Sequence, residues 1–326
     1  MQALVWDGST AAVGERTQPV ARDDLALLRV RVAGVCSTDL EIVKGYMGFR
    51  GVLGHEFVGE VVDGPKGWIE GWEGARAVGE INFACASCAS CTRGLERHCP
   101  HRRVLGILDA DGAMAQYVAV PSANLHRVPE SLADEAAVFT EPVAAAWEIL
   151  EQLPLGPEQR CVVLGDGKLG LLIAQVLQSS GARVLTVGRH AGKLALLSRL
   201  GIETALLDAW RGRARAERHD TDVVVEATGS PAGFRLALEA VRPRGTIVLK
   251  STVAEAPSLD LSPVVIDEIQ VLGSRCGPFA PALAALAAGR VRVGELIHDR
   301  FDLADGARAL ERAAEPGVLK VLVDCA

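Results

Sequence analysis

The distribution of apolar residues differs between the two halves of the chain. Downstream of residue 142, short apolar runs alternate with segments whose apolar residues recur at helical spacing. The expected strands are residues 161–164, 183–187, 222–227, 246–249 and 269–272. The expected helices are residues 169–180, 193–200 and 280–288. Because strands alternate with helices, this half predicts βαβ units and a parallel sheet.

Upstream of residue 142, the pattern consists of short β-rich segments separated by glycine, with few helical stretches. The clearest of these segments are residues 1–6, 27–35, 59–62 and 117–120. The whole chain has 326 residues, which accommodates about two domains. It is 49% hydrophobic and 23% charged, so it can form packed cores and is not disordered as a whole. The sequence therefore predicts an α/β protein with one β-rich part and one parallel-sheet part.

Charge and hydropathy exclude several classes of protein. The formal net charge is -7, from 34 basic and 41 acidic residues, and a mildly acidic chain without basic blocks predicts no nucleic-acid partner. We expect no membrane span, because no apolar run approaches about 18 residues. The first residues also lack the features of a secretory signal, so we expect a cytoplasmic protein. The eight cysteines then favour metal binding or catalysis over disulfides.

Four of the cysteines form one cluster with the spacing C-x2-C-x2-C-x7-C. They are Cys85, Cys88, Cys91 and Cys99. Four thiolates this close in sequence can complete a tetrahedral shell around one zinc ion, which leaves no position for a substrate. We therefore predict a structural zinc site that holds a loop in place. An iron–sulfur cluster, or free or disulfide-bonded cysteines, are the alternatives.

A second set of metal-binding residue types is spread along the first half. Cys36 follows an expected strand, the His55-Glu56 pair follows Gly54, and Glu141 lies at the junction of the two patterns. One thiolate, one imidazole and one carboxylate leave the fourth position of a zinc ion open, which is the arrangement of catalytic zinc. Each residue alone is weak evidence. Their presence beside the four-cysteine cluster favours a catalytic metal site.

Residues 162–170 are typical of a strand, a G-x-G-x-x-G turn and a helix. Gly165 permits the tight turn, Gly167 lets a pyrophosphate approach the backbone, and Gly170 lets the helix pack closely on the strand. Lys168 and Leu169 open the helix, whose N-terminus faces the phosphates. We predict a dinucleotide-binding turn.

The end of the following strand bears on the choice of dinucleotide. NAD sites carry an acidic residue there for the ribose 2′-hydroxyl, whereas this strand ends in Gly188 followed by Arg189. A small residue and a cation leave room for a 2′-phosphate, and Lys193 is near enough in sequence to help. NADP is therefore favoured. The alternative is that Arg189 is a solvated surface residue and NAD binds through its diphosphate.

Together these motifs resemble the zinc-dependent medium-chain alcohol dehydrogenases over nearly the whole chain. The chain is most similar to the sorbitol and threonine dehydrogenase branch, because Glu141 stands where the liver-type enzymes have a cysteine. The resemblance implies a GroES-like β-barrel catalytic domain over 1–142 and 278–326, interrupted by a doubly wound Rossmann domain over 143–277. It implies hydride transfer between NAD(P), with NADP favoured, and a secondary alcohol or polyol or the corresponding carbonyl.

The resemblance also implies the metal ligands. Cys36, His55 and Glu141 would hold the catalytic zinc, with Glu56 as an alternate ligand or a neighbouring carboxylate. Asp39 would hydrogen-bond His55 and fix its tautomer. With the structural site, the chain would bind two zinc ions.

Further roles follow from the same resemblance. Thr38 would relay the hydroxyl proton, with Ser37 as a less favoured substitute. The family's relay histidine is replaced by Glu41, so the proton could pass to water or to Glu41. Thr228 and Lys250 lie where the family lines the cofactor channel.

Three rival interpretations remain open. A zinc-free quinone or enoyl reductase has the same fold but lacks the zinc ligands. A non-catalytic NADP-binding protein has no need for an open metal position, and a tailoring dehydrogenase would act on one metabolite. The resemblance further implies a homodimer or homotetramer, with the strand at residues 269–272 as the pairing edge.

Overall fold

The computed structural model describes residues 1–22, 24–213, 218–251 and 259–326. It separates the chain into two units, each of which combines residues that are far apart in sequence. The first unit comprises Met1–Glu141, Phe279–Ala287 and Val293–Ala326. The second unit comprises Pro142–Pro278 and Ala288–Arg292.

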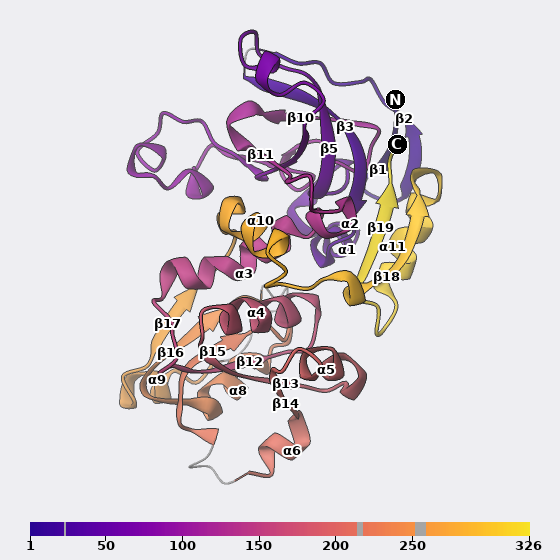
Figure 1. Ribbon diagram of the computed structural model, residues 1–326. Helices are drawn as coiled ribbons and strands as arrows, with labels where there is room; N and C mark the ends of the chain where they lie inside the picture. Colours follow the sequence, from indigo (N-terminus) through magenta and orange to yellow (C-terminus); the bar gives the residue numbers. More distant parts are fainter. Residues whose placement is uncertain (23, 214–217, 252–258) are drawn as a thin grey trace. The chain divides into compact units, whose positions relative to one another are not determined.

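One parallel sheet of six strands forms the second unit, in the order β14-β13-β12-β15-β16-β17 (Figure 1). Its strands are β12 (Arg160–Leu164), β13 (Arg183–Gly188), β14 (Glu203–Leu206), β15 (Thr221–Glu226), β16 (Val241–Leu249) and β17 (Gln270–Gly273). The chain runs outward from β12 to β14, returns to the centre at β15, and continues outward to β17. This is a doubly wound sheet, and such sheets bind ligands at the carboxyl ends of the strands where the winding reverses.

Helices pack against the apolar strands of this sheet. The described helices of the second unit are α4 (Lys168–Ser179), α5 (Ala191–Ser198), α6 (Leu207–Arg211), α8 (Gly233–Ala240) and α9 (Ser262–Ile266), together with α3 (Thr140–Gln152) from Pro142 onward. Helix α4 contacts β12 and β13, while α8 contacts β12, β15 and β16. One core of this unit joins Val162, Val224 and Ile247 from the strands to Trp210 and Phe234 from the helices.

The first unit is built mainly from antiparallel strands. Its largest sheet has the order β11-β6-β5-β3-β19-β18, with β10 also paired to β3, and two smaller sheets have the orders β2-β1-β4 and β7-β8-β9. The strands are β1 (Gln2–Trp6), β2 (Ala11–Glu15), β3 (Leu25–Gly34), β4 (Gly51–Val52), β5 (Glu56–Asp63), β6 (Arg76–Gly79), β7 (Asn82–Phe83), β8 (Arg103–Leu105), β9 (Asp109–Ala110), β10 (Tyr117–Pro121), β11 (Leu125–Arg127), β18 (Ile297–Asp302) and β19 (Lys320–Asp324).

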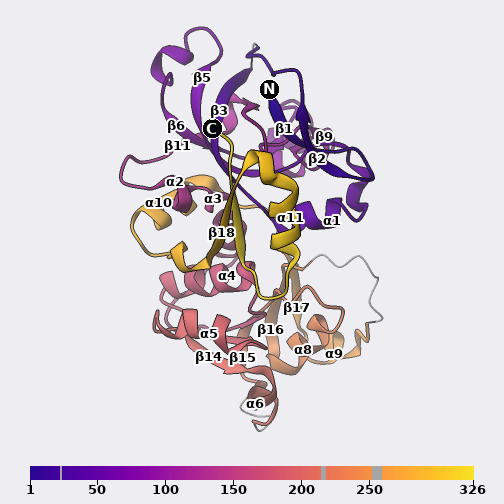
Figure 2. The same cartoon turned by 90° about the vertical axis from the view of Figure 1, so that its right-hand side faces the viewer.

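Helices in the first unit are few and mostly short. The α-helices are α1 (Ser37–Ile42), α2 (Asp134–Ala137), α10 (Phe279–Ala287) and α11 (Gly306–Ala314). The 3-10 helices are η1 (Tyr46–Gly48), η2 (Ile69–Gly71), η3 (Cys91–Arg93), η4 (Glu96–His98), η5 (Ser122–Asn124), η6 (Gly294–Leu296) and η7 (Leu303–Asp305). Helix α11 lies along β18 and β19 (Figure 2). The C-terminal strand β19 pairs with β3, so distant parts of the chain complete one sheet.

The twelve segments that the apolar pattern predicts are all present as strands or helices of the expected type. The largest boundary error is at β16, which begins at Val241 rather than at 246. The cause is an irregularity: Val241 pairs with Thr221, but the next paired residue is Thr246, opposite Val223. The intervening residues include Pro243 and the positive-φ Arg244, which are typical of turns. Within the described ranges, every helix is too short or too polar to cross a membrane.

Candidate active site and nucleotide site

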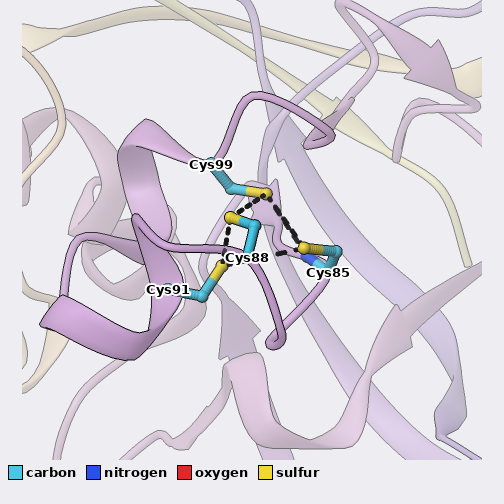
Figure 3. A group of neighbouring side chains, drawn as sticks. All are labelled: Cys85, Cys88, Cys91 and Cys99. Atoms are coloured by element: carbon cyan, nitrogen blue, oxygen red, sulfur yellow. Dashed lines mark hydrogen bonds between the residues drawn. The ribbon is translucent and has the colours of Figure 1, made fainter.

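Four cysteine side chains converge between β7 and β8 of the first unit. Their Sγ atoms point toward one another (Figure 3). The Sγ atoms are 3.5 Å apart for Cys85–Cys99 and for Cys88–Cys91, 3.8 Å apart for Cys88–Cys99, and 4.0 Å apart for Cys85–Cys91. Four sulfurs at about 2.3 Å from a tetrahedral zinc ion lie about 3.8 Å from one another. The cluster therefore fits a structural zinc ion.

The backbone around this cluster favours thiolates. N–H groups of Ser87 and Cys88 lower the pKa of Cys85 to about 5, and the N–H of Cys91 lowers the pKa of Cys88. Burial instead raises the pKa of Cys91 to about 12. A cation that binds the Cys91 sulfur must displace its proton, which is the ordinary coupling between metal binding and proton release.

A second group joins Cys36, His55 and Glu56, whose possible ligand atoms all lie within 4.8 Å of one another. Strand pairing creates this proximity. Gly34, at the end of β3, is paired with Glu56, the first residue of β5. Cys36 follows β3 and forms the N-cap of α1, and His55 immediately precedes β5. The pattern of two adjacent antiparallel strands thus brings together residues that are 19 or more positions apart in the sequence.

Asp39 holds the two segments of this group together from a fully buried position. Its Oδ2 accepts a hydrogen bond from the Cys36 N–H at 2.8 Å, and its Oδ1 accepts one from the Gly54 N–H at 3.3 Å. The same Oδ1 lies 3.3 Å from His55 Nδ1. Asp39 therefore faces Nδ1 and leaves the other ring nitrogen of His55 for a metal.

The electrostatics of the group also favour a cation. Burial disfavours the charged form of His55, but the negative charges of Asp39 and Cys36 outweigh it and raise the pKa of His55 well above its ordinary value. A buried imidazole that draws a proton in this way can exchange that proton for a metal ion. The donor set and its charge therefore fit zinc.

The residues proposed for proton transfer lie on α1. Thr38 is half-buried, and its Oγ1 is 3.8 Å from Cys36 Sγ. Ser37 is exposed. Glu41 is also exposed, and its carboxylate accepts a hydrogen bond from Lys44 at 2.9 Å.

One charged residue of this site was not predicted from the sequence. Lys320, the first residue of β19, forms an ion pair with Glu56, and both side chains are fully buried. Its Nζ also lies 3.5 Å from the Val35 carbonyl oxygen and 5.1 Å from the centroid of the Phe139 ring. Burial lowers the pKa of Lys320 to about 8, against the opposing effect of the Cys36 and neighbouring negative charges.

Glu141 is the one predicted ligand that comes from α3. It lies in the first turn of α3 and is half-buried. Of the predicted ligands of the catalytic zinc, Cys36, His55 and Glu56 form a group of mutually close ligand atoms. The predicted alternate ligand Glu56 thus belongs to the group, and Glu141 is the last residue of the first unit before the chain enters the second.

The glycine-rich turn has the shape that a pyrophosphate needs. Gly165 has φ +122°, and a Cβ there would lie 2.4 Å from the Ala227 carbonyl oxygen. A Cβ at Gly170 would lie 2.2 Å from the Gly165 carbonyl oxygen. By contrast, Gly167 faces open space and forms the N-cap of α4, which begins at Lys168. Two of the glycines are thus required for packing, and the third leaves the helix N-terminus accessible to a phosphate.

The remaining predicted cofactor residues differ in their surroundings. Gly188 is buried at the end of β13, Arg189 is exposed and Lys193 is half-buried on α5; Leu169 is half-buried on α4. The N–H and Oγ1 of Thr228 donate hydrogen bonds to Glu226 Oε1 at 2.8 and 2.6 Å.

Lys250 has partners within its own unit. Its Nζ donates hydrogen bonds to the carbonyl oxygens of Ala145 and Arg275 at 2.5 and 2.8 Å. Its Nζ also lies 3.2 Å from Ser274 Oγ. The ammonium group of Lys250 therefore links α3 to the segment after β17.

Two family profiles match the chain. One is described as the alcohol dehydrogenase GroES-like domain and matches residues 22–130. The other is described as zinc-binding dehydrogenase and matches residues 169–288.

Individual relatives match over nearly the full length. The chain is 28% identical to D-arabitol-phosphate dehydrogenase of Enterococcus avium, over 94% of this chain and 91% of that protein. It is 31% identical to L-threonine 3-dehydrogenase of Streptomyces avermitilis, over 91% of each. Its structure is similar to that of a protein described as a zinc-binding dehydrogenase of Sinorhizobium meliloti 1021 bound to NADP. The TM-score is 0.91 and the identity 27%, with coverage of 99% of this chain and 98% of that one.

Proposed function

The chain belongs to the zinc-dependent medium-chain alcohol dehydrogenase family, and from this premise we propose which of its residues carry the reaction. It is an NAD(P)-dependent oxidoreductase of alcohols or polyols, with a GroES-like part and a Rossmann-like part. The observation that carries the assignment of residues is the convergence of Cys36 and His55 on one point, with the carboxylate of Glu56 beside them. We assign the first unit as the catalytic domain and the second as the nucleotide-binding domain.

Cys36, His55 and Glu141 are the proposed ligands of the catalytic zinc. Zinc supplies a Lewis acid that favours loss of the proton from an alcohol and polarises a carbonyl in the reverse direction. A thiolate, a carboxylate and a neutral imidazole together balance the charge of one Zn²⁺. Glu56 already has its charge compensated by Lys320, so it serves as the neighbouring carboxylate and alternate ligand.

Thr38 is the proposed acceptor and relay of the hydroxyl proton. Its hydroxyl lies beside Cys36 Sγ and can accept one hydrogen bond while donating another. Glu41 is exposed and bonded to Lys44. We therefore propose that the proton passes from Thr38 to water.

The turn at Gly165–Gly170 is the proposed diphosphate site, and the nicotinamide supplies the hydride acceptor. NADP is the favoured cofactor in this proposal because Arg189 and Lys193 place two cations after the end of β13. The substrate class is a secondary alcohol or polyol. It is supported by the similarity to dehydrogenases of arabitol phosphate and threonine.

We also propose a homodimer or homotetramer, paired through β17. This strand is at the edge of the parallel sheet, and an unpaired edge is a template for pairing with another copy. Its Val271 is 44% exposed, and Val265 and Ile266 of α9 are 77% and 76% exposed. A Val271→Lys variant that keeps the mass of the wild type in light scattering would contradict this pairing. The proposed compartment is the cytoplasm, because the eight free cysteines include the metal-binding thiolates.

Zinc content and turnover of a Cys36→Ser variant test the proposed active site. The wild type should contain two zinc ions per chain and reduce NADP⁺ with secondary alcohols or polyols. The variant should retain one zinc ion and lose turnover. Cys161→Ala is the matched control, because Cys161 is a buried cysteine of the other unit. Wild-type turnover in Cys36→Ser with one zinc ion would refute the assignment.

A further inference from the structure

Asp166 places a carboxylate at the end of the second strand of the nucleotide-binding sheet. It lies inside the glycine-rich turn, between Gly165 and Gly167, and only 8% of its surface is exposed. A Cβ on Gly188, the last residue of β13, would lie 2.6 Å from both Cβ and Oδ2 of Asp166 and 2.7 Å from its Cγ. The side chain of Asp166 therefore fills the space that a side chain at position 188 would occupy.

Backbone hydrogen bonds fix this carboxylate. Its Oδ2 accepts hydrogen bonds from the N–H groups of Arg189 and His190 at 2.7 and 2.6 Å. The Nδ1 atom of His190 lies 3.0 Å from Oδ2 and 3.2 Å from Oδ1. A carboxylate has about four lone-pair positions, so Oδ1 retains capacity for a further donor.

Dinucleotide sites of this fold bind the adenosine ribose through an acidic residue at the end of the second strand. Here the second strand, β13, ends in Gly188, and the acidic side chain at this place is that of Asp166 in the glycine-rich turn. We propose that Asp166 is the ribose-recognising carboxylate, so that the protein binds NAD as well as NADP and Asp166 sets the ratio between them. This inference rests on the proposed role of the turn at Gly165–Gly170.

The same contacts disfavour a 2′-phosphate. The N–H of His190 lies at the N-cap of α5, and N–H groups at a helix N-terminus are natural ligands of anions. Asp166 already occupies them, and its negative charge opposes a phosphate at the same place. Arg189 and Lys193 attract the phosphate, so the cofactor ratio reflects a balance that removal of Asp166 would shift.

Binding of cofactor fragments tests the proposal without catalysis. The probes are 5′-AMP and adenosine 2′,5′-bisphosphate, titrated by calorimetry against the zinc-loaded wild type and Asp166→Ala. The wild type should bind both probes. In Asp166→Ala the ratio of the two dissociation constants should shift at least tenfold toward the bisphosphate, and the KM ratio of NADP⁺ to NAD⁺ should move in the same direction.

Two further variants separate a local effect from loss of folding or of net charge. Asp208→Ala removes an exposed carboxylate of the same unit and should leave the ratio within twofold. The double variant Asp166→Gly with Gly188→Asp moves the carboxylate to the strand and should return the preference toward 5′-AMP.

An unchanged ratio in a folded Asp166→Ala protein would overturn the proposal. If Asp166→Ala does not fold, the test rests on the double variant. A double variant that does not favour 5′-AMP over the bisphosphate would also overturn the proposal. Failure of the proposed dinucleotide-binding function would give a different result, because the wild type would then bind neither probe.

Discussion

Replacement of Lys320 by methionine should destabilise the first unit strongly. The Lys320 and Glu56 side chains are both 0% exposed and form an ion pair. Methionine keeps much of the side-chain volume but leaves the Glu56 carboxylate buried without this cation. Removal of one partner of a buried pair costs about 3–5 kcal/mol, so the free energy of unfolding should fall by about that amount.

The second partner can be removed as well. In the double variant Glu56→Met with Lys320→Met neither charge remains, and replacing both members of a buried pair by apolar residues of similar volume is often nearly neutral. The double variant should therefore recover most of the loss, to within about 1–2 kcal/mol of the wild type. Lys44→Met is the matched surface control. Lys44 forms an exposed ion pair with Glu41, and its replacement should cost less than about 1 kcal/mol.

Native-state hydrogen exchange is the suitable assay, because it reports each unit separately. The informative amides are those that join β3, β5 and β19, such as the Val35 N–H, which donates to the Val321 carbonyl oxygen at 3.0 Å. Samples should have equal zinc content, since bound metal itself stabilises the folded state. A Lys320→Met protein whose protection in these strands stays within 1 kcal/mol of the wild type would refute the reasoning.

Three other perturbations test separate parts of the structure. Cys91→Ser should lose one zinc ion per chain while the other remains, as counted with a chromogenic chelator; two retained zinc ions would contradict the tetrahedral site. Burial acts to raise the pKa of Asp222, but hydrogen bonds from Arg160 and Arg242 outweigh it and lower that pKa. Its stabilising contribution is therefore complete above about pH 4 and lost as pH falls. The stability gap of about 1–2 kcal/mol between wild type and Asp222→Asn should close in acid; a gap independent of pH would count against this. Gly167→Ala should fold normally but bind NADP⁺ more weakly, whereas Gly170→Ala should lower the melting temperature, because only the second Cβ meets backbone; equal melting temperatures would contradict the packing role.

Much of the fold follows from local sequence patterns. One short segment specifies the strand β12, the turn at Gly165–Gly170 and the helix α4. The spacing of its apolar residues and the positions of its glycines indicate each of these elements. The four-cysteine cluster is likewise local, since its members span only residues 85–99. In such segments the residues that make contact are close in sequence, so spacing alone predicts geometry.

Other features depend on pairing between distant segments. Lys320 contacts Glu56 only because β19 pairs with β3 and β3 pairs with β5. No local pattern marks it beyond a single lysine in an apolar run. The position of Asp166 escaped prediction for a related reason, because its relation to Gly188 depends on the parallel pairing of β12 with β13.

The pairing of β19 with β3 also constrains the order in which the protein can form during synthesis. Residues of β19 leave the ribosome after those of the entire parallel-sheet unit, and the contact from Lys320 to Val35 closes a loop of 285 residues. The nascent chain must therefore hold β3 and β5 with an exposed edge, and Glu56 without its lysine, while the intervening unit folds. Ribosome-bound chains that end before β19 should remain open to proteolysis in the first unit and become resistant only when that strand emerges.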